Sequence, residues 1–446
     1  MMKRKRLKHK HITSFQIIIL GFLSMIVLGS LLLMLPFATQ DGKGAVFSDA
    51  LFTATSAVCV TGLILRDTAT YWSIFGQSVI LFLIQIGGMG IVTVSVAVAA
   101  FSGRKIGLMQ RSTMQEAVSA YHVGGIVRLT KFILKISVCI ELMGAVLLLP
   151  PFIRDFGVPK GLFYSLFHSV SAFCNAGFDL MGVKEPFSSL TSYSSQPFVN
   201  VTVMALIIIG GIGFLTWEDI KNNKLCFRNY RMQSKVILTV TGILILLPAL
   251  YFFFFEYSEL PLGERVLSSL FQSVTTRTAG FNSTDLTSFS ETGQMMMILL
   301  MLIGGSPGST AGGMKTTTVV VLVASALSVF RKREQTQMFK RRIPDETVKS
   351  AATVFLMYIA LFLGGGMMIS QLENLPLLTT LFETASAIGT VGLSLGITSQ
   401  LGMVSQFILI MLMFFGRVGG LTLIFAALTG TETNASNYPQ ERITVG

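Results

Sequence analysis

Eight apolar stretches of bilayer length limit how this chain can fold more than any other feature of it. They lie at residues 15–36, 74–101, 132–152, 198–216, 236–255, 295–330 with an interruption after 303, 351–369 and 406–428. A helix needs about 20 such residues to cross the hydrocarbon core of a membrane. Since 52% of the residues are hydrophobic and only 13% are charged, we expect an all-α polytopic membrane protein with eight transmembrane helices. The first stretch is longer than the apolar region of a signal peptide, about 7 to 15 residues, so we expect it to remain as a membrane helix.

The positive charge of the chain is concentrated in alternate loops. Of the 34 lysines and arginines, 25 lie in the N-terminal tail, after residue 102, after residue 217, in 331–349 and at Arg442. Basic residues favour the cytoplasmic side of a membrane, so we expect a multi-pass protein of the cell (plasma) membrane with both termini cytoplasmic. The net charge of +12 then reflects orientation in the bilayer. No basic patch is interleaved with aromatic residues, and we expect no binding to nucleic acid.

A short signature recurs four times, once in each quarter of the chain. It begins with Leu-Phe, continues with small and polar residues and is followed shortly by a glycine. The pairs start at Leu51, Leu166, Leu270 and Leu381, and the glycines are Gly62, Gly177, Gly280 and Gly392. Two apolar stretches flank each signature, so every unit returns the chain to the same side of the membrane. The four units are therefore parallel repeats, and their loops can face one axis.

Each signature is too short to cross the hydrocarbon core and fits a half-helix that enters from the outer face. The partial negative charge at its C-terminal end favours a cation in the middle of the membrane. We predict a unit of span, pore half-helix and span (M1-P-M2) repeated four times around a pseudo-fourfold pore. The predicted segments are a basic N-terminus at 1–14, repeats at 15–101, 126–216, 232–330 and 347–428, and a cytoplasmic tail at 429–446.

The residues that end in each loop glycine are the predicted selectivity filter. Glycine tolerates the backbone angles that turn carbonyls toward an axis, and rings of carbonyl oxygens replace the hydration shell of potassium in channels. Repeat 4 has the Thr-Val-Gly of potassium channels without the Tyr-Gly that continues it, which predicts a shorter filter. Repeat 3 has one residue fewer before its glycine, so the ring is not expected to be strictly fourfold. The predicted potassium-binding residues are Val60, Thr61, Gly62, Asn175, Ala176, Gly177, Thr278, Ala279, Gly280, Thr390, Val391 and Gly392.

Other polar residues near the loops are interpreted as structural. Cys59 and Cys174 each lie three residues before a loop glycine, and we expect them to pack behind the filter. His168 and Glu383 lie at the same position of two half-helices, where packing or hydrogen bonding is expected rather than ion binding. The four cysteines have no disulfide or metal spacing.

The third M2 is interrupted by Gly304, Gly305, Ser306, Pro307, Gly308, Ser309, Thr310, Ala311, Gly312 and Gly313. Proline removes a backbone donor and glycine weakens helices, so this segment cannot be a continuous helix. Unpaired backbone at this depth needs a wet cavity, and we expect a flexible loop that borders the pore. Arg417 follows its own filter glycine at a similar distance, and a buried arginine is a functional candidate. We predict that Arg417 binds freed carbonyls of the loop and forms a gate with it, with Lys315 nearer the cytoplasm.

These features together resemble the Trk/Ktr/HKT superfamily of potassium transporters, and within it the KtrB-type membrane subunits of bacterial uptake systems. The resemblance covers nearly the whole chain. It implies potassium uptake by a channel-like subunit, and a homodimer in which each protomer has its own pore. It also implies control by a cytosolic ring of nucleotide-binding, KtrA-like subunits, with no cofactor in this chain. Whether sodium activates transport is left open; in the family, serine at the first loop glycine goes with sodium transport.

Two other classes of protein share single features with this sequence. A phosphate-binding enzyme loop at 308–316 fails, because Met314 separates the last glycine from Lys315 and no soluble strand precedes it. No catalytic triad or metal cluster appears elsewhere, so we expect no enzyme. An alternating-access secondary transporter for potassium or sodium is the alternative, and its usual signature is inverted repeats or a buried carboxylate. Here the repeats are parallel and Glu141 is the one acid clearly inside a span, which favours a pore.

Overall fold

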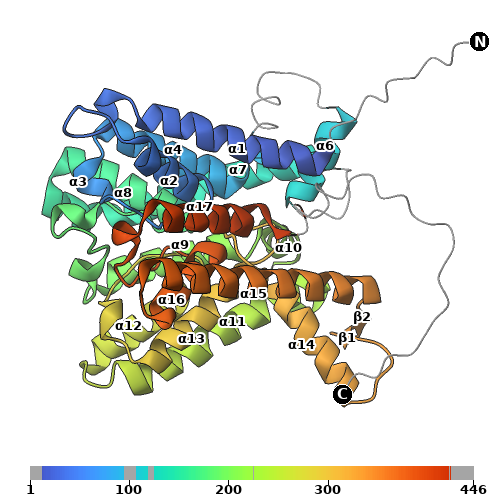
Figure 1. Cartoon of the computed structure of the whole chain (residues 1–446). Coiled ribbons are helices and arrows are strands. Elements are labelled where there is room, and N and C mark those ends of the chain that lie inside the picture. The colour runs from blue at the N-terminus through green and yellow to red at the C-terminus, as the bar shows by residue number, and fades with distance from the viewer. Residues whose placement is uncertain (1–12, 95–106, 119–124, 225, 421, 423–446) are drawn as a thin grey trace, which may run out of the picture.

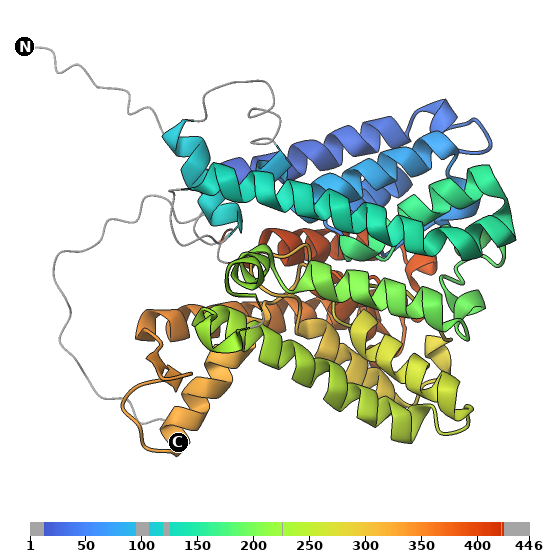
Figure 2. The same cartoon turned by 180° about the vertical axis from the view of Figure 1, so that it is seen from behind.

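The computed structural model describes residues 13–94, 107–118, 125–224, 226–420 and 422, and this part of the chain is predominantly helical, as predicted. The long helices run side by side in one bundle (Figures 1 and 2). The α-helices are α1 (Ser14–Leu33), α2 (Phe47–Val58), α3 (Thr68–Tyr71), α4 (Ile74–Met89), α6 (Leu108–Val118), α7 (Ile126–Phe156), α8 (Val158–Phe173), α9 (Pro197–Gly211), α10 (Phe214–Asn223), α11 (Met232–Tyr251), α12 (Leu262–Thr275), α13 (Glu291–Leu302), α14 (Thr316–Phe330), α15 (Asp345–Glu373), α16 (Leu377–Gly389) and α17 (Met403–Val418).

Shorter elements lie in the connections between these helices. A π-helical turn, η5 (Phe252–Glu256), extends α11, and strands β1 (Gln337–Met338) and β2 (Arg341–Arg342) form an antiparallel hairpin. Short 3₁₀ helices are η1 (Pro36–Ala38), η2 (Met181–Val183), η3 (Thr191–Tyr193), η4 (Phe227–Asn229), η6 (Leu286–Ser288) and η7 (Thr398–Gln400).

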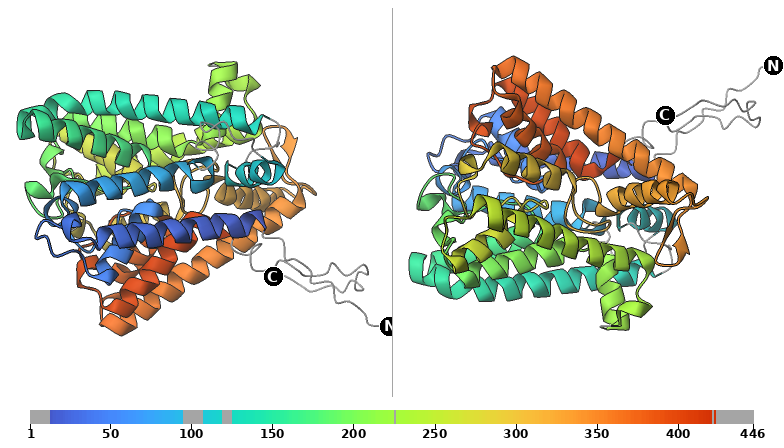
Figure 3. Two further views of the ribbon diagram at one scale, coloured as in Figure 1. Left: turned by 90° about the horizontal axis from the view of Figure 1, so that it is seen from above. Right: turned by 90° about the horizontal axis from the view of Figure 1, so that it is seen from below.

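Each quarter of the chain contains a long apolar helix, a short buried helix, a loop and a second apolar region. The short helices are α2, α8, α12 and α16, and most of their side chains are buried. The long helices surround them and expose apolar side chains such as Leu20 and Leu31 of α1. Figure 3 shows repeat 1 (blue) and repeat 3 (yellow) on opposite faces, each lying between repeats 2 and 4. The four short helices therefore point into a common interior.

The second apolar region of each repeat is less regular than the sequence predicted. Among the described residues, four helices (α1, α7, α11 with η5, and α15) are long and apolar enough to span a membrane, or five if α9 and α10, bent by 94°, count as one span. The other apolar helices, α4, α13, α14 and α17, have 10 to 17 residues. Glycines are the cause, because Gly90, Gly213 and Gly419 have φ of 83°, 92° and 87° at the helix ends. Residues 95–101 of the predicted repeat 1 lie outside the described residues.

Other glycines of these helices allow close packing against the half-helices. A Cβ on Gly87 of α4 would overlap the carbonyl of Val58, where α2 ends. Gly210 of α9 stands in the same relation to Phe173, where α8 ends, and Gly416 of α17 to Ile388 in the last turn of α16. The second helices can therefore approach the C-terminal ends of three half-helices without an intervening side chain, as small residues permit in membrane proteins.

Candidate ion pathway

The four loop glycines meet in the interior of the protein. A Cβ added to Gly62 would lie 2.5 Å from the carbonyl oxygen of Ala176, and one added to Gly177 would lie 2.8 Å from that of Ala279. The two remaining pairs of glycine and facing carbonyl are Gly280 with Val391, and Gly392 with Thr61. The contacts run from repeat 1 to 2, 2 to 3, 3 to 4 and 4 back to 1. They close a ring of residues 60–62, 175–177, 278–280 and 390–392, which we call the loop ring.

Two residues of each loop have left-handed backbone. The φ angles are 50° to 65° at Val60, Asn175, Thr278 and Thr390, and 69° to 97° at the four glycines. One residue separates each pair, and this alternation turns successive carbonyls toward the same side of the strand. Left-handed angles are rare for β-branched residues such as Val60, and strain of this kind is concentrated at functional sites. All twelve residues predicted for the filter lie on the loop ring, and the eight that are not glycine are buried.

A hydroxyl group that sequence reasoning missed holds each loop to its half-helix. It belongs to the sixth residue of each signature, and these residues are Ser56, Ser171, Thr275 and Ser386. In repeats 1 and 4 the glycine N–H donates to this hydroxyl at 3.0 Å. In repeats 2 and 3 the hydroxyl donates at 2.7 Å to the carbonyl of the residue after the glycine. The signal was present in the sequence as a Ser or Thr at one position of all four copies.

The shorter third loop keeps the geometry of the ring. Thr278 and Gly280 have φ of 65° and 79°, like their counterparts in the other repeats. Thr278 follows the hydroxyl residue Thr275 by three positions, whereas Val60 follows Ser56 by four. The missing residue is therefore lost between the hydroxyl residue and the ring, where α12 ends at Thr275 itself while α2 continues for two residues beyond Ser56.

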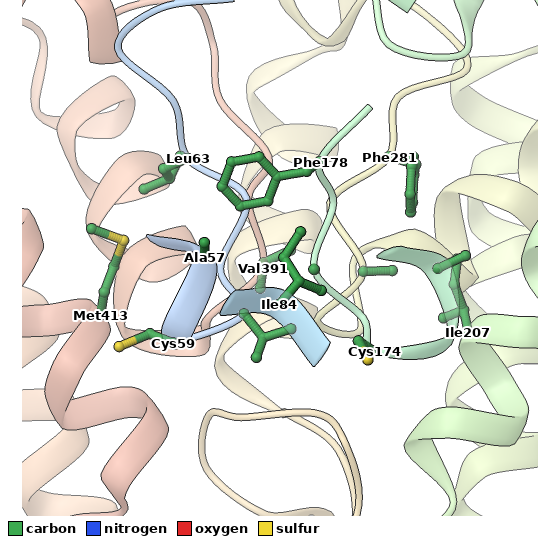
Figure 4. Close-up of a cluster of buried hydrophobic side chains, with 14 of the residues drawn as sticks. Ala57, Cys59, Leu63, Ile84, Cys174, Phe178, Ile207, Phe281, Val391 and Met413 are labelled. Atoms are coloured by element: carbon green, nitrogen blue, oxygen red, sulfur yellow. The ribbon is translucent and has the colours of Figure 1, made fainter. Parts of the chain in front are cut away.

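The polar side chains behind the ring bind the protein itself. His168 Nδ1 donates to the Tyr164 carbonyl at 2.7 Å, and Nε2 accepts from Leu180 N at 3.3 Å. Glu383 accepts hydrogen bonds from Ser394 and, at 3.0 Å, from Thr398. Figure 4 shows Leu63, Phe178 and Phe281 toward one end of the loop strands and Cys59 and Cys174 toward the other; both cysteines are buried.

The glycine-rich segment of repeat 3 forms a non-helical loop between α13, which ends at Leu302, and α14, which begins at Thr316. Ser306 N and Thr310 N donate to the carbonyls of Gly211 and Gly210, at 3.1 and 3.3 Å. Thr310 Oγ1 also donates to the Phe173 carbonyl at 3.0 Å. A Cβ on Gly312 would overlap the Thr390 side chain of the loop ring. The loop therefore packs against the ends of α8 and α9 and against the ring itself.

Arg417 joins this loop to the end of α4. Its guanidinium donates to the carbonyls of Thr310 and Gly87, and at 3.0 Å to that of Gly88. The last carbonyls of a helix have no partner within the helix, so Arg417 satisfies acceptors of both elements. Lys315 is directed back to its own loop, where Nζ donates to the Ala311 carbonyl at 2.8 Å.

A cavity of about 290 Å³ borders the loop, and both Arg417 and Lys315 line it. At roughly 30 Å³ for each water molecule, this volume holds about ten of them. The irregular backbone of the loop therefore lies beside a space that can be wet, which is the condition for such backbone at membrane depth. The arrangement offers a cation a ring of carbonyls and, beyond it, a cavity bordered by a tethered loop and two positive charges.

Comparison with known proteins gives the same picture over the whole chain. The model of the TrkH family, described as a cation transport protein, matches residues 2–437. The chain is 39% identical to the potassium/sodium uptake protein NtpJ of Enterococcus hirae, over 99% of each chain. It is also 39% identical to the Ktr system potassium uptake protein B of Bacillus subtilis, over 100% of this chain and 99% of that one. The crystal structure of the potassium transporter TrkH from Vibrio parahaemolyticus aligns with a TM-score of 0.74 at 20% identity, covering 96% of this chain and 87% of that one. The chain is thus a multi-pass membrane protein and not an enzyme, and it belongs to the TrkH family of cation transport proteins.

Proposed function

We propose that this chain is the ion-translocating, channel-like subunit of a Ktr-type system for potassium uptake. The observation that carries the proposal is the loop ring, in which four equivalent loops bring left-handed backbone and carbonyls to one axis. Rings of carbonyl oxygens replace the hydration shell of potassium. The names of the relatives in E. hirae and B. subtilis, a potassium/sodium uptake protein and a potassium uptake protein, support the choice of ion.

The loop ring is the proposed selectivity filter, with potassium bound by its carbonyls as the transported ion. Each strand contributes two left-handed residues around one other residue, which supports a short filter. Whether sodium is carried or acts as an activator is part of the same proposal, since one relative is named for both ions.

The proposed gate is the loop of residues 304–313 together with Arg417 and Lys315. Arg417 binds Thr310 in the middle of the loop and the end of α4 at the same time. Its positive charge lines the cavity beside the loop, where it opposes the passage of a cation. Release of the loop from Arg417 would remove both the barrier and the charge from the path.

The proposed architecture is eight spans and four half-helices in parallel M1-P-M2 repeats, with both termini in the cytoplasm. The repeated order of long helix, buried short helix, loop and apolar helix supports it, as does the bias of basic residues to alternate loops. The N-terminus up to residue 12 and the tail 429–446 lie outside the described residues.

The proposed partners are a second copy of this chain and a cytosolic ring of KtrA-like subunits that bind the regulatory nucleotide. Relatives named as components of Ktr systems support a multi-component assembly. The test is purification in mild detergent, where a dimer is expected; a strict monomer that binds no such ring would defeat this part of the proposal.

Uptake of potassium and sodium by transport-deficient bacterial cells tests the function. Cells that express the wild-type chain should accumulate potassium, and Gly62→Ser should weaken the preference for potassium over sodium. If Ser or Asp at each of Gly62, Gly177, Gly280 and Gly392 left both uptakes unchanged, the filter assignment would be wrong. Flux per protein in proteoliposomes separates the pore from the alternative, an alternating-access transporter, because a pore conducts much faster.

A further inference from the structure

A second cavity, of about 200 Å³, lies on the side of the loop ring that faces away from the 304–313 loop. All four glycines of the ring line it. We call it the mouth cavity, because in the proposed orientation it is the outer entrance to the filter.

The residue two positions after each glycine also lines the mouth cavity. These residues are Ile64, Asp179, Asn282 and Ser394, from repeats 1 to 4 in order. Since the repeats follow one another around the axis, the four side chains form an outer ring beside the loop ring. Asp179 and Ser394 come from opposite repeats, as do Ile64 and Asn282. The four positions are equivalent in the repeats, but their side chains differ. The outer ring has a carboxylate, an amide, a hydroxyl and one aliphatic side chain.

Asp179 is the charged member of the outer ring. It is half-buried, and its Oδ1 accepts a hydrogen bond from Met181 N at 2.9 Å. In the described part of the chain, no lysine or arginine forms an ion pair with it. Burial and, to a lesser degree, the carboxylate of Asp67 raise the pKa of Asp179 to about 7. An opposite charge within a few ångströms favours the ionised form of a carboxyl, and a cation on the axis supplies that charge.

Asn282 presents an amide beside this carboxylate. Its backbone is fixed, because Asn282 N donates to Ser189 Oγ at 3.1 Å and its carbonyl accepts from Leu190 N at 2.8 Å. Its side-chain Oδ1 is buried and has no hydrogen-bond partner among the described residues. A buried polar atom of this kind needs an explanation, and a water or a cation bound beside Asn282 would supply one. On the far side, the Ser394 hydroxyl donates to Glu383, which places a second acidic residue directly behind the outer ring.

We propose that the mouth cavity is an outer cation site, in which Asp179 and Asn282 hold a hydrated potassium ion before it enters the filter. The proposal rests on the function proposed above. A volume of 200 Å³ corresponds to about six water molecules at roughly 30 Å³ each, so an ion there keeps much of its hydration shell. The carboxylate raises the local concentration of cations at the entrance. The site therefore acts on capture of the ion, while the carbonyls of the loop ring determine which ion passes.

The experiment is the concentration dependence of potassium uptake in transport-deficient bacterial cells. Asp179→Asn should raise KM for potassium about threefold to tenfold, as expected for loss of one nearby charge, with maximal rate and preference over sodium retained. Asn282→Asp adds a second carboxylate to the outer ring and should lower KM. Glu259→Gln removes an exposed acidic side chain that does not line the cavity, and KM should stay at the wild-type value.

Each outcome supports or overturns the site. Opposite shifts of KM in Asp179→Asn and Asn282→Asp support it. Wild-type KM in both variants overturns it, and so does an Asp179→Asn variant that loses maximal rate and selectivity at unchanged KM, because Asp179 then only supports the turn at Met181. If Asp179→Asn does not reach the membrane, KM of Asn282→Asp decides alone: a lower value supports the site and an unchanged value overturns it. No potassium uptake by the wild type would overturn the proposed function itself and the site with it.

Discussion

Replacing Gly177 by alanine tests whether the close contact between loops is what binds the ion. The new Cβ would lie 2.8 Å from the Ala279 carbonyl oxygen, whereas ordinary contacts of this kind begin at 3.4 Å. The Ala279 carbonyl must therefore move by about 0.6 Å, more than the roughly 0.5 Å within which a binding site has to be held. Misplacement on this scale costs about tenfold or more in activity. We expect potassium uptake by Gly177→Ala to lose at least about tenfold in apparent affinity, measured as KM in transport-deficient cells.

Gly42 provides a matched control for the cost of placing alanine in a left-handed backbone conformation. It has the same φ of 69°, with no heavy atom within 4 Å of an added Cβ. Alanine in a left-handed conformation costs about 1–2 kcal/mol at either position, so both variants should lose similar thermal stability in detergent. Only Gly177→Ala should lose potassium affinity. Equal KM values in the two variants, both properly folded, would refute the reasoning, because the contact with Ala279 would then have no part in binding.

Three further predictions concern residues around the ring. Arg417→Gln removes charged hydrogen bonds, each contributing about 1.5–3 kcal/mol, and should raise potassium flux in proteoliposomes at least about tenfold; lower flux with potassium still bound would place the gate elsewhere. Ser171→Ala should cost about 1 kcal/mol of stability and weaken the preference for potassium over sodium. Ser24→Ala, which removes a similar bond on the exposed face of α1, should change neither. Glu141→Gln should keep uptake, since in the described part of the chain the Glu141 carboxylate accepts hydrogen bonds only from Gln85 Nε2, at 2.9 and 3.0 Å; a folded variant without uptake would favour alternating access.

The sequence predicted those parts of the site that depend on the local residue types along the chain. Four glycines in register led to the loops, and ten residues poor in helix formers led to the break in repeat 3. Arg417 was expected to bind freed carbonyls of that loop, and its contact with Thr310 is of this kind. Its bonds to Gly87 and Gly88 were not foreseen, because the sequence does not indicate which helix end lies opposite an arginine 329 residues away.

Glycine is the residue whose role the sequence left ambiguous. Gly87 and Gly90 are three positions apart in one apolar run, where the sequence is compatible with a kink or with close packing at either glycine. In the structure Gly87 is helical and makes room for the carbonyl of Val58, while Gly90 has φ of 83° and follows the last residue of α4. Both uses depend on the missing Cβ. At Gly87 its absence leaves room for a neighbouring carbonyl, and at Gly90 it permits a positive φ. Hydropathy is the same in either case, so it did not indicate that Gly90 would interrupt the helix, which resumes at residues 91–94.

The differences between equivalent positions are where the repeats acquire separate roles. The backbone of the loop ring is alike in all four repeats, which suits an ion that is bound by neutral carbonyls on every side. Behind it, the third residue of each signature is Thr53, His168, Gln272 or Glu383. His168 and Glu383 bind the strands that leave the ring in repeats 2 and 4, at Leu180 and Ser394, whereas Thr53 Oγ1 and Gln272 Oε1 have no hydrogen-bond partner in the described part of the chain. In repeats 2 and 4 the half-helix therefore braces the strand that leaves the ring, whereas in repeat 3 that strand is held by the bonds of Asn282 to Ser189 and Leu190. The strands braced in this way also carry Asp179 and Ser394 of the outer ring, so in repeats 2 and 4 the half-helix that ends at the filter also supports a residue at its entrance.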